Sequence, residues 1–194
     1  MSEHDADFEG PIATVLPKPG SKRRRLKEML RVDHAGEHGA VQIYRGQRAV
    51  FDRLPHKQAT ARLLEEMEDG EQHHLDTFDR LLAERGVRPT LASPFWTIAG
   101  FGLGAVTALM GEKAAMACTE TVEDVIEKHY AEQAVELATI DPDLAETVTQ
   151  FREDELGHKH TAEENGALEA PAYMLMKSVI GFGCRVAIRV SEKI

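Results

Sequence analysis

Cysteine is scarce in this chain of 194 residues, and its 23 basic residues are outnumbered by 33 acidic ones. Its two cysteines, Cys118 and Cys184, are too few for a disulfide framework, which indicates a reducing interior. No nucleophile motif surrounds either of them, so we expect both in the core. The formal net charge is −10, and the one tight basic run covers only 22–25. These features argue against a nucleic-acid-binding surface and predict no nucleic-acid partner.

Strand patterns are also rare, because alternating runs of Val, Ile and Thr hardly occur. Stretches that lack proline and are rich in Ala, Leu, Glu, Lys, Arg and Gln are instead long, which is typical of helices. We therefore predict an all-α fold, with one bundle domain over 22–194. Four long helices are expected, at 22–51, 56–85, 112–138 and 143–165.

The start of the chain has no basic targeting signal, because it is acidic where a signal or transit peptide would be basic. We expect the mature protein to begin here. Glycine and proline are frequent in the same stretch, so residues 1–21 are predicted to form a poorly ordered tail.

The expected helix ends have local causes. Pro55 interrupts the first helical pair, and Gly86, followed by Pro89, ends the second helix. Asp141 supplies an N-cap for the fourth helix, and Pro142 fits its first turn. At 1.5 Å per residue such helices are about 35–45 Å long, which favours a long bundle.

Two apolar segments stand apart from these helices. Residues 89–111 carry no charge, and their length could span a bilayer, but Pro94 and three nearby glycines argue against an uninterrupted spanning helix. Residues 171–194 are apolar and carry a net charge of +3 in an acidic protein. We interpret both as candidate membrane-interacting segments.

Each predicted helix carries a mostly apolar stripe at heptad spacing, and each stripe has a glutamate near its middle. These glutamates are Glu37, Glu71, Glu123 and Glu155. An unpaired buried carboxylate costs several kcal/mol, so four on inward stripes require something positive between them. A metal centre meets this requirement most simply.

The glutamates form two units, with spacings of 34 residues in the first and 32 in the second. In both units the second helix carries Glu-x-x-His, as Glu71/His74 and Glu155/His158, and the chain has no other match. Residues three apart share a helix face and can reach one ion. Two single glutamates plus two Glu-x-x-His pairs is the ligand pattern of ferritin-like carboxylate bundles. Such ligation suits iron or manganese, so we predict a di-metal centre.

Other polar side chains near these positions have weaker claims on the site. His34 could hydrogen-bond to a ligand residue without binding a metal itself, whereas His38 is expected to point away from the site. His73 is turned about 100° from the next histidine and should face a neighbour or solvent. Tyr130 returns to the third stripe and His129 lies beside it; a relay role near the metals and ordinary packing both remain open for this pair.

Residues 100–105 match Gly-x-Gly-x-x-Ala, but no strand precedes them and no βαβ unit surrounds them. A dinucleotide site is therefore not expected there. Small residues that allow close packing of helices or lipid explain the glycines better.

Five stretches also resemble a known family. They are RVDHAGEHGA (31–40), IYRGQ (43–47), GEKAAMACT (111–119), APAY (170–173) and GCRVAI (183–188). In this order, over about residues 22–194, they resemble the demethoxyubiquinone hydroxylase family of ubiquinone biosynthesis. That family consists of membrane-associated, ferritin-like di-iron monooxygenases, so the resemblance implies this fold and activity here.

The resemblance implies two iron ions as cofactor, O2 and NADH as co-substrates, and a prenylated demethoxybenzoquinone as substrate. It places the His129/Tyr130 pair near the metals and implies that two of the glutamates, Glu71 and Glu155, bridge both ions. The implied ligands are Glu37, Glu71, His74, Glu123, Glu155 and His158, all of which are intact.

The substrate's isoprenoid tail gives the apolar segments 89–111 and 171–194 a purpose at a membrane surface. We expect peripheral attachment on the cytoplasmic side of a bacterial-type cell membrane or the matrix side of the mitochondrial inner membrane. A homo-oligomer and an accessory lipid-presenting protein remain open. The alternative to the membrane role is that these segments cap the bundle or form a dimer face.

Two residues depart from the family pattern: His38 replaces a usual tyrosine, and Gly157 replaces a common acidic residue. Neither belongs to the ligand set, but a glycine weakens a helix locally. Two other functions compete with hydroxylation: a ferritin-like ferroxidase or peroxide-detoxifying di-metal protein, and a metal-free bundle that acts as a scaffold.

Overall fold

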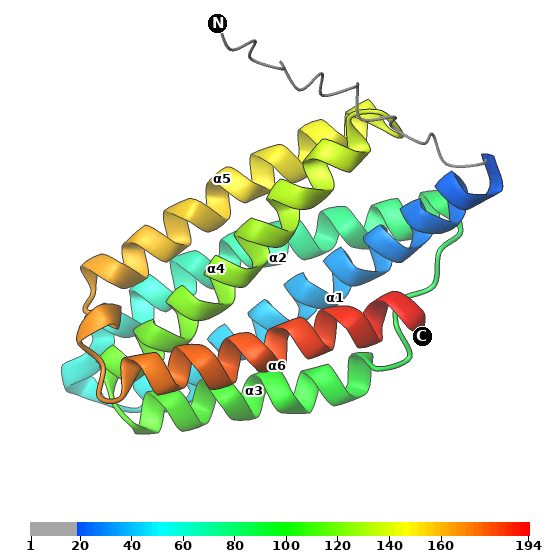
Figure 1. The fold of residues 1–194 in the computed structure, drawn as a ribbon. Helices are drawn as coiled ribbons and strands as arrows, with labels where there is room; N and C mark the ends of the chain where they lie inside the picture. The colour runs from blue at the N-terminus through cyan, green and yellow to red at the C-terminus, as the bar shows by residue number, and fades with distance from the viewer. Residues whose placement is uncertain (1–18) are drawn as a thin grey trace, which may run out of the picture.

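α-Helices make up almost all of the structure, a computed structural model that describes residues 19–194 (Figure 1). No strand occurs in that range, so the all-α prediction is confirmed. Two short 3-10 turns, Pro55–Lys57 and Ala167–Glu169, lie in the connections. The α-helices of the described chain are α1 (Pro19–Phe51), α2 (Gln58–Arg85), α3 (Ser93–Leu109), α4 (Glu112–Leu137), α5 (Pro142–Glu164) and α6 (Tyr173–Lys193).

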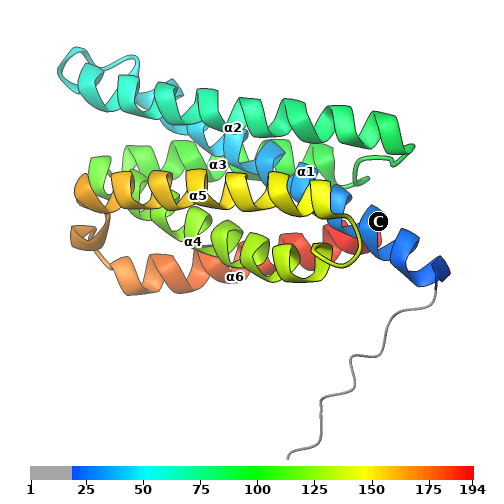
Figure 2. The same cartoon turned by 90° about the horizontal axis from the view of Figure 1, so that it is seen from above.

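Helices α1, α2, α4 and α5 form a ferritin-like four-helix bundle (Figures 1 and 2). α1 and α2 make one antiparallel hairpin, and α4 and α5 make the other. The connection between the hairpins contains α3, which packs along α1. α6 lies beside α3 and contacts both α1 and α4. The two apolar segments are therefore neighbouring helices on one flank of the bundle.

The helix ends follow the local signals in the sequence. Gly86 adopts a left-handed conformation, with φ of 60°, after the last residue of α2. The amide of Val87 then donates to the carbonyl of Leu82 at 2.9 Å, which closes the helix end. At the start of α5, the Asp141 side chain accepts a hydrogen bond of 3.2 Å from the amide of Leu144. Both predicted boundaries are confirmed.

Two helix starts differ by two or more residues from the sequence expectation, and α5 begins one residue early, at Pro142. α2 begins at Gln58 rather than at 56, because Pro55 starts a 3-10 turn before the helix. α1 begins at Pro19, so residues 19–21 of the expected tail are helical. The rest of that tail, 1–18, lies outside the described residues.

Glycines allow the backbones of α1 and α3 to touch. A Cβ at Gly46 would overlap the carbonyl of Phe101, and a Cβ at Gly104 would overlap the carbonyl of Ile43. The segment 100–105 is helical throughout, so it forms no phosphate-binding turn. Its glycines serve close helix packing, as the sequence suggested.

α3 is too short to cross a bilayer. Its 17 residues span about 25 Å, less than the roughly 30 Å of a hydrocarbon core. Pro94 lies in its first turn, where proline does not break a helix. Across residues 19–194, no helix combines the length and the apolar character that crossing a membrane requires.

One of the two cysteines is fully buried in the core between the helices. Cys118 is completely buried on α4, as predicted. Cys184 on α6 is only partly buried and packs against the edge of that core. The prediction of two core cysteines therefore holds fully for the first and partly for the second.

Candidate metal centre

Each bundle helix directs one glutamate into the interior. Glu37 lies on α1, Glu71 on α2, Glu123 on α4 and Glu155 on α5, and each is at most 1% exposed. All four belong to the mostly apolar stripes of their helices. Packing those stripes against one another therefore brings the carboxylates together.

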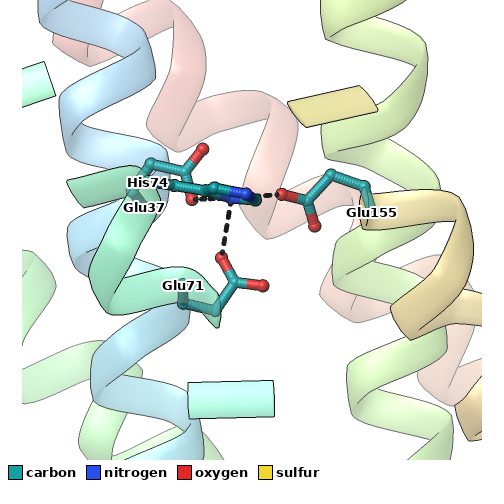
Figure 3. Close-up of side chains that lie close together, drawn as sticks. All are labelled: Glu37, Glu71, His74 and Glu155. Carbon is teal, nitrogen blue, oxygen red and sulfur yellow. Dashed lines mark ion pairs between the residues drawn. The ribbon is translucent and has the colours of Figure 1, made fainter. Parts of the chain in front are cut away.

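The six predicted ligands form two overlapping groups of four. Within each group, one potential ligand atom from every residue lies within 4.8 Å of the others. The first group is Glu37, Glu71, His74 and Glu155 (Figure 3), and the second is Glu71, Glu123, Glu155 and His158. Glu71 and Glu155 belong to both groups, which is the arrangement needed for carboxylates shared by two ions.

His74 lies among three glutamates in the first group. Its Nδ1 is 3.1 Å from Glu155 Oε1, 3.7 Å from Glu37 Oε2 and 3.9 Å from Glu71 Oε2 (Figure 3). In the second group, His158 Nδ1 is 2.7 Å from Glu71 Oε1. Both imidazoles thus direct Nδ1 towards the carboxylates.

Several buried atoms of this set have no hydrogen-bond partner among the described residues. They are Glu37 Oε2, Glu71 Oε2, His74 Nδ1, Glu123 Oε2 and both carboxylate oxygens of Glu155. Buried polar atoms are rarely left unpaired, because the loss of their hydration is costly. Divalent cations would satisfy these oxygen and nitrogen atoms, which are donors suited to iron or manganese. The residues present therefore fit a two-metal centre.

The electrostatics of the protein chain alone point the same way. Burial, with neighbouring carboxylates adding to it, raises the pKa of Glu71 and Glu123 well above its ordinary value. Burial acts to lower the pKa of the histidines, but pairing with glutamates outweighs it and raises the pKa to about 11 for His74 and about 10 for His158. Burial also acts to raise the pKa of Glu155, yet both histidines lower it to about 2. Protonated imidazoles offset the carboxylates, so metal binding must release protons.

Two buried tyrosines donate hydrogen bonds to Glu37 and Glu123. These two glutamates belong to one ligand group each and are called the outer glutamates below. Tyr130 on α4 donates a hydrogen bond to Glu37 on α1, and Tyr44 on α1 donates one of 2.6 Å to Glu123 on α4. Burial raises the pKa of both phenols well above 10, so both remain protonated donors. Tyr44 is a site residue that was not among those predicted. The signal was its position seven residues after Glu37, which is the spacing from Glu123 to Tyr130.

His129 does not reach the glutamates directly. The Gln133 amide donates to Asp33 Oδ1 at 2.7 Å and lies 2.8 Å from His129 Nε2. Asp33 is buried one turn before Glu37, and burial raises its pKa. The His129 ring is 6.5 Å from the ring of Tyr130. His129 is thus part of a polar cluster with Gln133 and Asp33, next to Tyr130. Its role in the reaction stays a prediction.

Comparison with known proteins leads to one family. A family model described as "Ubiquinone biosynthesis protein COQ7" matches residues 24–191. The chain belongs to the COQ7 family. The resemblance seen in the five short stretches is therefore confirmed.

Three relatives illustrate how far the likeness to COQ7-family proteins extends. A 3-demethoxyubiquinol 3-hydroxylase of Rhodospirillum rubrum is 46% identical over 179 residues, covering 92% of this chain and 83% of its own. A human mitochondrial protein named NADPH-dependent 3-demethoxyubiquinone 3-hydroxylase is 43% identical over 176 residues, covering 89% and 79%. A mitochondrial 5-demethoxyubiquinone hydroxylase of Saccharomyces cerevisiae is 42% identical over 185 residues, covering 87% and 78%.

Three further histidines of this COQ7-family chain lie outside the two ligand groups. His34 Nε2 lies 3.0 Å from Asp79 Oδ1 on α2, and His38 Nε2 lies 2.8 Å from Thr97 Oγ1 on α3. His73 is exposed, as expected. The two departures from the family pattern leave the helices intact, since α1 and α5 continue without interruption through 38 and 157.

An apolar groove of about 500 Å³ lies near the helix turns that carry Glu37 and Glu123. It runs between α1, α3, α4 and α6, and almost all of its lining is apolar. Gly36 and Val122, the sequence neighbours of Glu37 and Glu123, line it. The groove thus connects the flank formed by α3 and α6 with the helix segments that carry two of the predicted ligands.

Proposed function

We propose that this chain is a di-iron monooxygenase that hydroxylates the ring of demethoxyubiquinone in ubiquinone biosynthesis. The observation that carries the proposal is that Glu71 and Glu155 belong to both ligand groups, so two ions can share them. The names of the bacterial and human relatives describe this hydroxylation in those proteins. The same relatives give no support to a ferroxidase or a peroxide-detoxifying protein.

Each ion would take its own terminal glutamate and histidine and share the two central glutamates. Glu37 and His74 would serve one position, and Glu123 and His158 the other. The four carboxylates would balance the four positive charges of two ferrous ions, which makes burial of the centre feasible. When bound, the iron pair supplies the reductive activation of O2 and the transfer of one oxygen atom to the ring.

The chain's own residues would order and insulate that chemistry. Tyr44 and Tyr130 hold the outer carboxylates by hydrogen bonds from opposite helix pairs. The apolar stripes around the centre keep out water, which strengthens every charge interaction inside. His129, in the polar cluster with Gln133 and Asp33, would assist electron or proton movement towards Glu37.

The apolar groove is the site that we propose for the prenylated quinone. Its volume of about 500 Å³ is typical of a small-molecule site, and its lining offers no charge to a neutral substrate. The ring would lie at the end marked by Gly36 and Val122, and the isoprenoid tail would follow α3 and α6 towards the protein surface.

That surface supports a peripheral membrane position. α3 and α6 expose large apolar side chains that include Phe95, Ile98, Leu109, Met174, Val179 and Phe182. Exposed cationic residues at 185, 189 and 193 on α6 would meet anionic lipid headgroups. We propose insertion of this flank into one leaflet, on the cytoplasmic side of a bacterial-type membrane or the matrix side of the mitochondrial inner membrane.

Electrons would come from a reduced nicotinamide nucleotide. The resemblance in the sequence implies NADH, while the name of the human relative prints NADPH for that protein. The described residues contain no dinucleotide-binding turn at 100–105. Because the resemblance and the relative's name indicate different nucleotides, both NADH and NADPH belong in the assay.

The direct test is anaerobic incubation of the iron-loaded protein with demethoxyubiquinone and either nucleotide, followed by isotopically labelled O2. The proposal predicts a quinone product that has gained one labelled oxygen atom, detected by mass spectrometry. Glu155→Ala should lose iron and product together, whereas Glu153→Ala, an exposed neighbour on the same helix, should keep both. Oxidation of the iron with no change in the quinone would favour the ferroxidase alternative.

A further inference from the structure

The two halves of the centre repeat one another in register. α4 repeats α1 with an offset of 86 residues, which matches Glu37 with Glu123 and Tyr44 with Tyr130. α5 repeats α2 with an offset of 84 residues, which matches the two Glu-x-x-His pairs. Where corresponding residues of the repeat differ in type, the surroundings of the two metal positions differ as well.

His74 is held on three sides by residues of α5. Its ring stacks on Phe151, with centroids 3.9 Å apart and planes inclined by 25°. Its Nδ1 faces Glu155, and its Nε2 lies 3.2 Å from Asp154 Oδ2. Gln150 holds the other oxygen of Asp154 at 3.3 Å. Phe151 therefore fixes the plane of the His74 ring, and the Asp154 carboxylate contacts the ring nitrogen that is remote from the glutamates.

His158 has no equivalent carboxylate. The residue that corresponds to Asp154, 84 positions earlier, is Gly70. A Cβ built at Gly70 would lie 3.2 Å from His158 Nε2, so the His158 ring as it stands leaves no room for a carboxylate side chain at position 70. Met67 corresponds to Phe151, and the ring of Tyr44 lies edge-on to His158 with centroids 6.4 Å apart, so among residues 19–194 His158 has no stacked partner like that of His74.

The solvent exposure of the two histidines also indicates that His74 is the more tightly enclosed. The His158 side chain is 16% exposed, whereas the His74 side chain is 2% exposed. A histidine ligand whose second ring nitrogen donates to a carboxylate keeps its orientation and becomes a stronger donor to the metal. Only one of the two histidines has this support.

We propose that Asp154 is a positioning residue for His74, and that it makes the Glu37/His74 position the tighter of two unequal metal positions. The ion at the Glu37/His74 position would bind first, and the ion at the Glu123/His158 position would bind second and exchange more readily. This inference rests on the proposed di-metal function, because it concerns the order in which that centre fills.

The test is an anaerobic calorimetric titration of the metal-free protein with ferrous ion. The wild type should show two binding steps of different affinity. Asp154→Ala should weaken the tighter step by about 10–100-fold and leave the weaker step unchanged. Asp154→Asn, which keeps the shape but not the charge, guards against misfolding and should weaken the same step to a smaller degree. Glu153→Ala removes an exposed charge from the adjacent position and should change neither step.

A variant on the other half provides the matched comparison. Gly70→Ala places a methyl group against His158 and should affect only the weaker step. Two identical steps in the wild type, or an Asp154→Ala variant in which both steps or neither step changes, would overturn the inference while leaving a di-metal protein. Absence of any ferrous binding to the wild type would instead refute the proposed function.

Discussion

The Tyr44 hydroxyl donates a 2.6 Å hydrogen bond to Glu123, so α1 and α4 are linked through a buried carboxylate. Tyr130 and Glu37 form the same link in the opposite direction. These paired bonds hold the outer glutamates in place. They also make the two tyrosines the first positions at which the geometry of the centre can be tested.

Tyr44→Phe should remove the hydrogen-bond donor of Glu123 Oε1 and leave both buried oxygens of this carboxylate unpaired in the metal-free protein. Leaving a buried acceptor without its donor costs about 1–3 kcal/mol, so we expect a loss of that size in the free energy of unfolding and weaker iron binding. Denaturant unfolding and an iron count per chain measure both. Tyr173→Phe is the control, since its 2.9 Å bond to Glu120 lies outside the centre. Full iron affinity in Tyr44→Phe would contradict a role for this bond in the centre.

Glu123→Gln should separate stability from metal binding. Burial raises the pKa of Glu123 because its charge is costly there, so the neutral amide should stabilise the metal-free protein. The same variant loses a ligand, so added ferrous ion should no longer raise its melting temperature as it does in the wild type. Melting curves with and without iron provide the measurement. A metal-free variant that melts below the metal-free wild type would speak against uncompensated carboxylate charge at this position.

The stability of the metal-free protein should fall as pH rises from about 7 to about 10. The pKa values of His74 and His158 are raised to about 11 and about 10, so their stabilising effect is complete below an unfolded value of about 6.5. It is lost as pH rises through the folded values. The raised pKa values of Glu71 and Glu123 act with the same sign. The lowered pKa of Glu155 matters only under acidic conditions, below its unfolded value of about 4.3.

Melting temperatures of chelator-treated protein across this pH range provide the check. Iron binding should show the opposite trend and strengthen with pH, because the ions displace protons from both imidazoles. A metal-free melting temperature that stays constant or rises up to about pH 9 would contradict the ion pairs described for these histidines.

Charge on the α3 and α6 flank should weaken membrane attachment. Ile98 on α3 is 75% exposed and Phe182 on α6 is 64% exposed, and an aspartate at either would have to enter the lipid interface. Co-sedimentation with vesicles that contain anionic phospholipid should show reduced binding. Val135→Asp supplies the control, because Val135 is 77% exposed on α4. Equal loss in all three variants would indicate that net charge, rather than this flank, controls the binding.

Much of the fold could be predicted because its causes are local. Gly86 and Asp141 end and begin helices through bonds to residues within five positions of themselves. The ligand stripes follow from helical periodicity, which fixes the face of Glu71 and His74 without knowledge of their neighbours. Fold class and candidate ligands therefore depended on patterns that a single sequence displays.

The remaining features depend on contacts between distant segments. The sequence does not reveal that Gly46 meets the carbonyl of Phe101, since that contact requires α3 to fold back on α1. Asp154 likewise has a role only because α5 packs beside His74 on α2. Tyr44 could have been identified from the internal repeat, but its bond to Glu123 needed the packed bundle.

The adjacent histidines of α2 allow the most direct test of the di-metal centre. His74 is buried among the glutamates, and His73 is exposed one position earlier. After anaerobic loading, iron analysis of wild type and His73→Ala should give two ions per chain, and His74→Ala should lose the centre. Two ions per chain in His74→Ala, or their loss in His73→Ala, would contradict the assignment of the metal site.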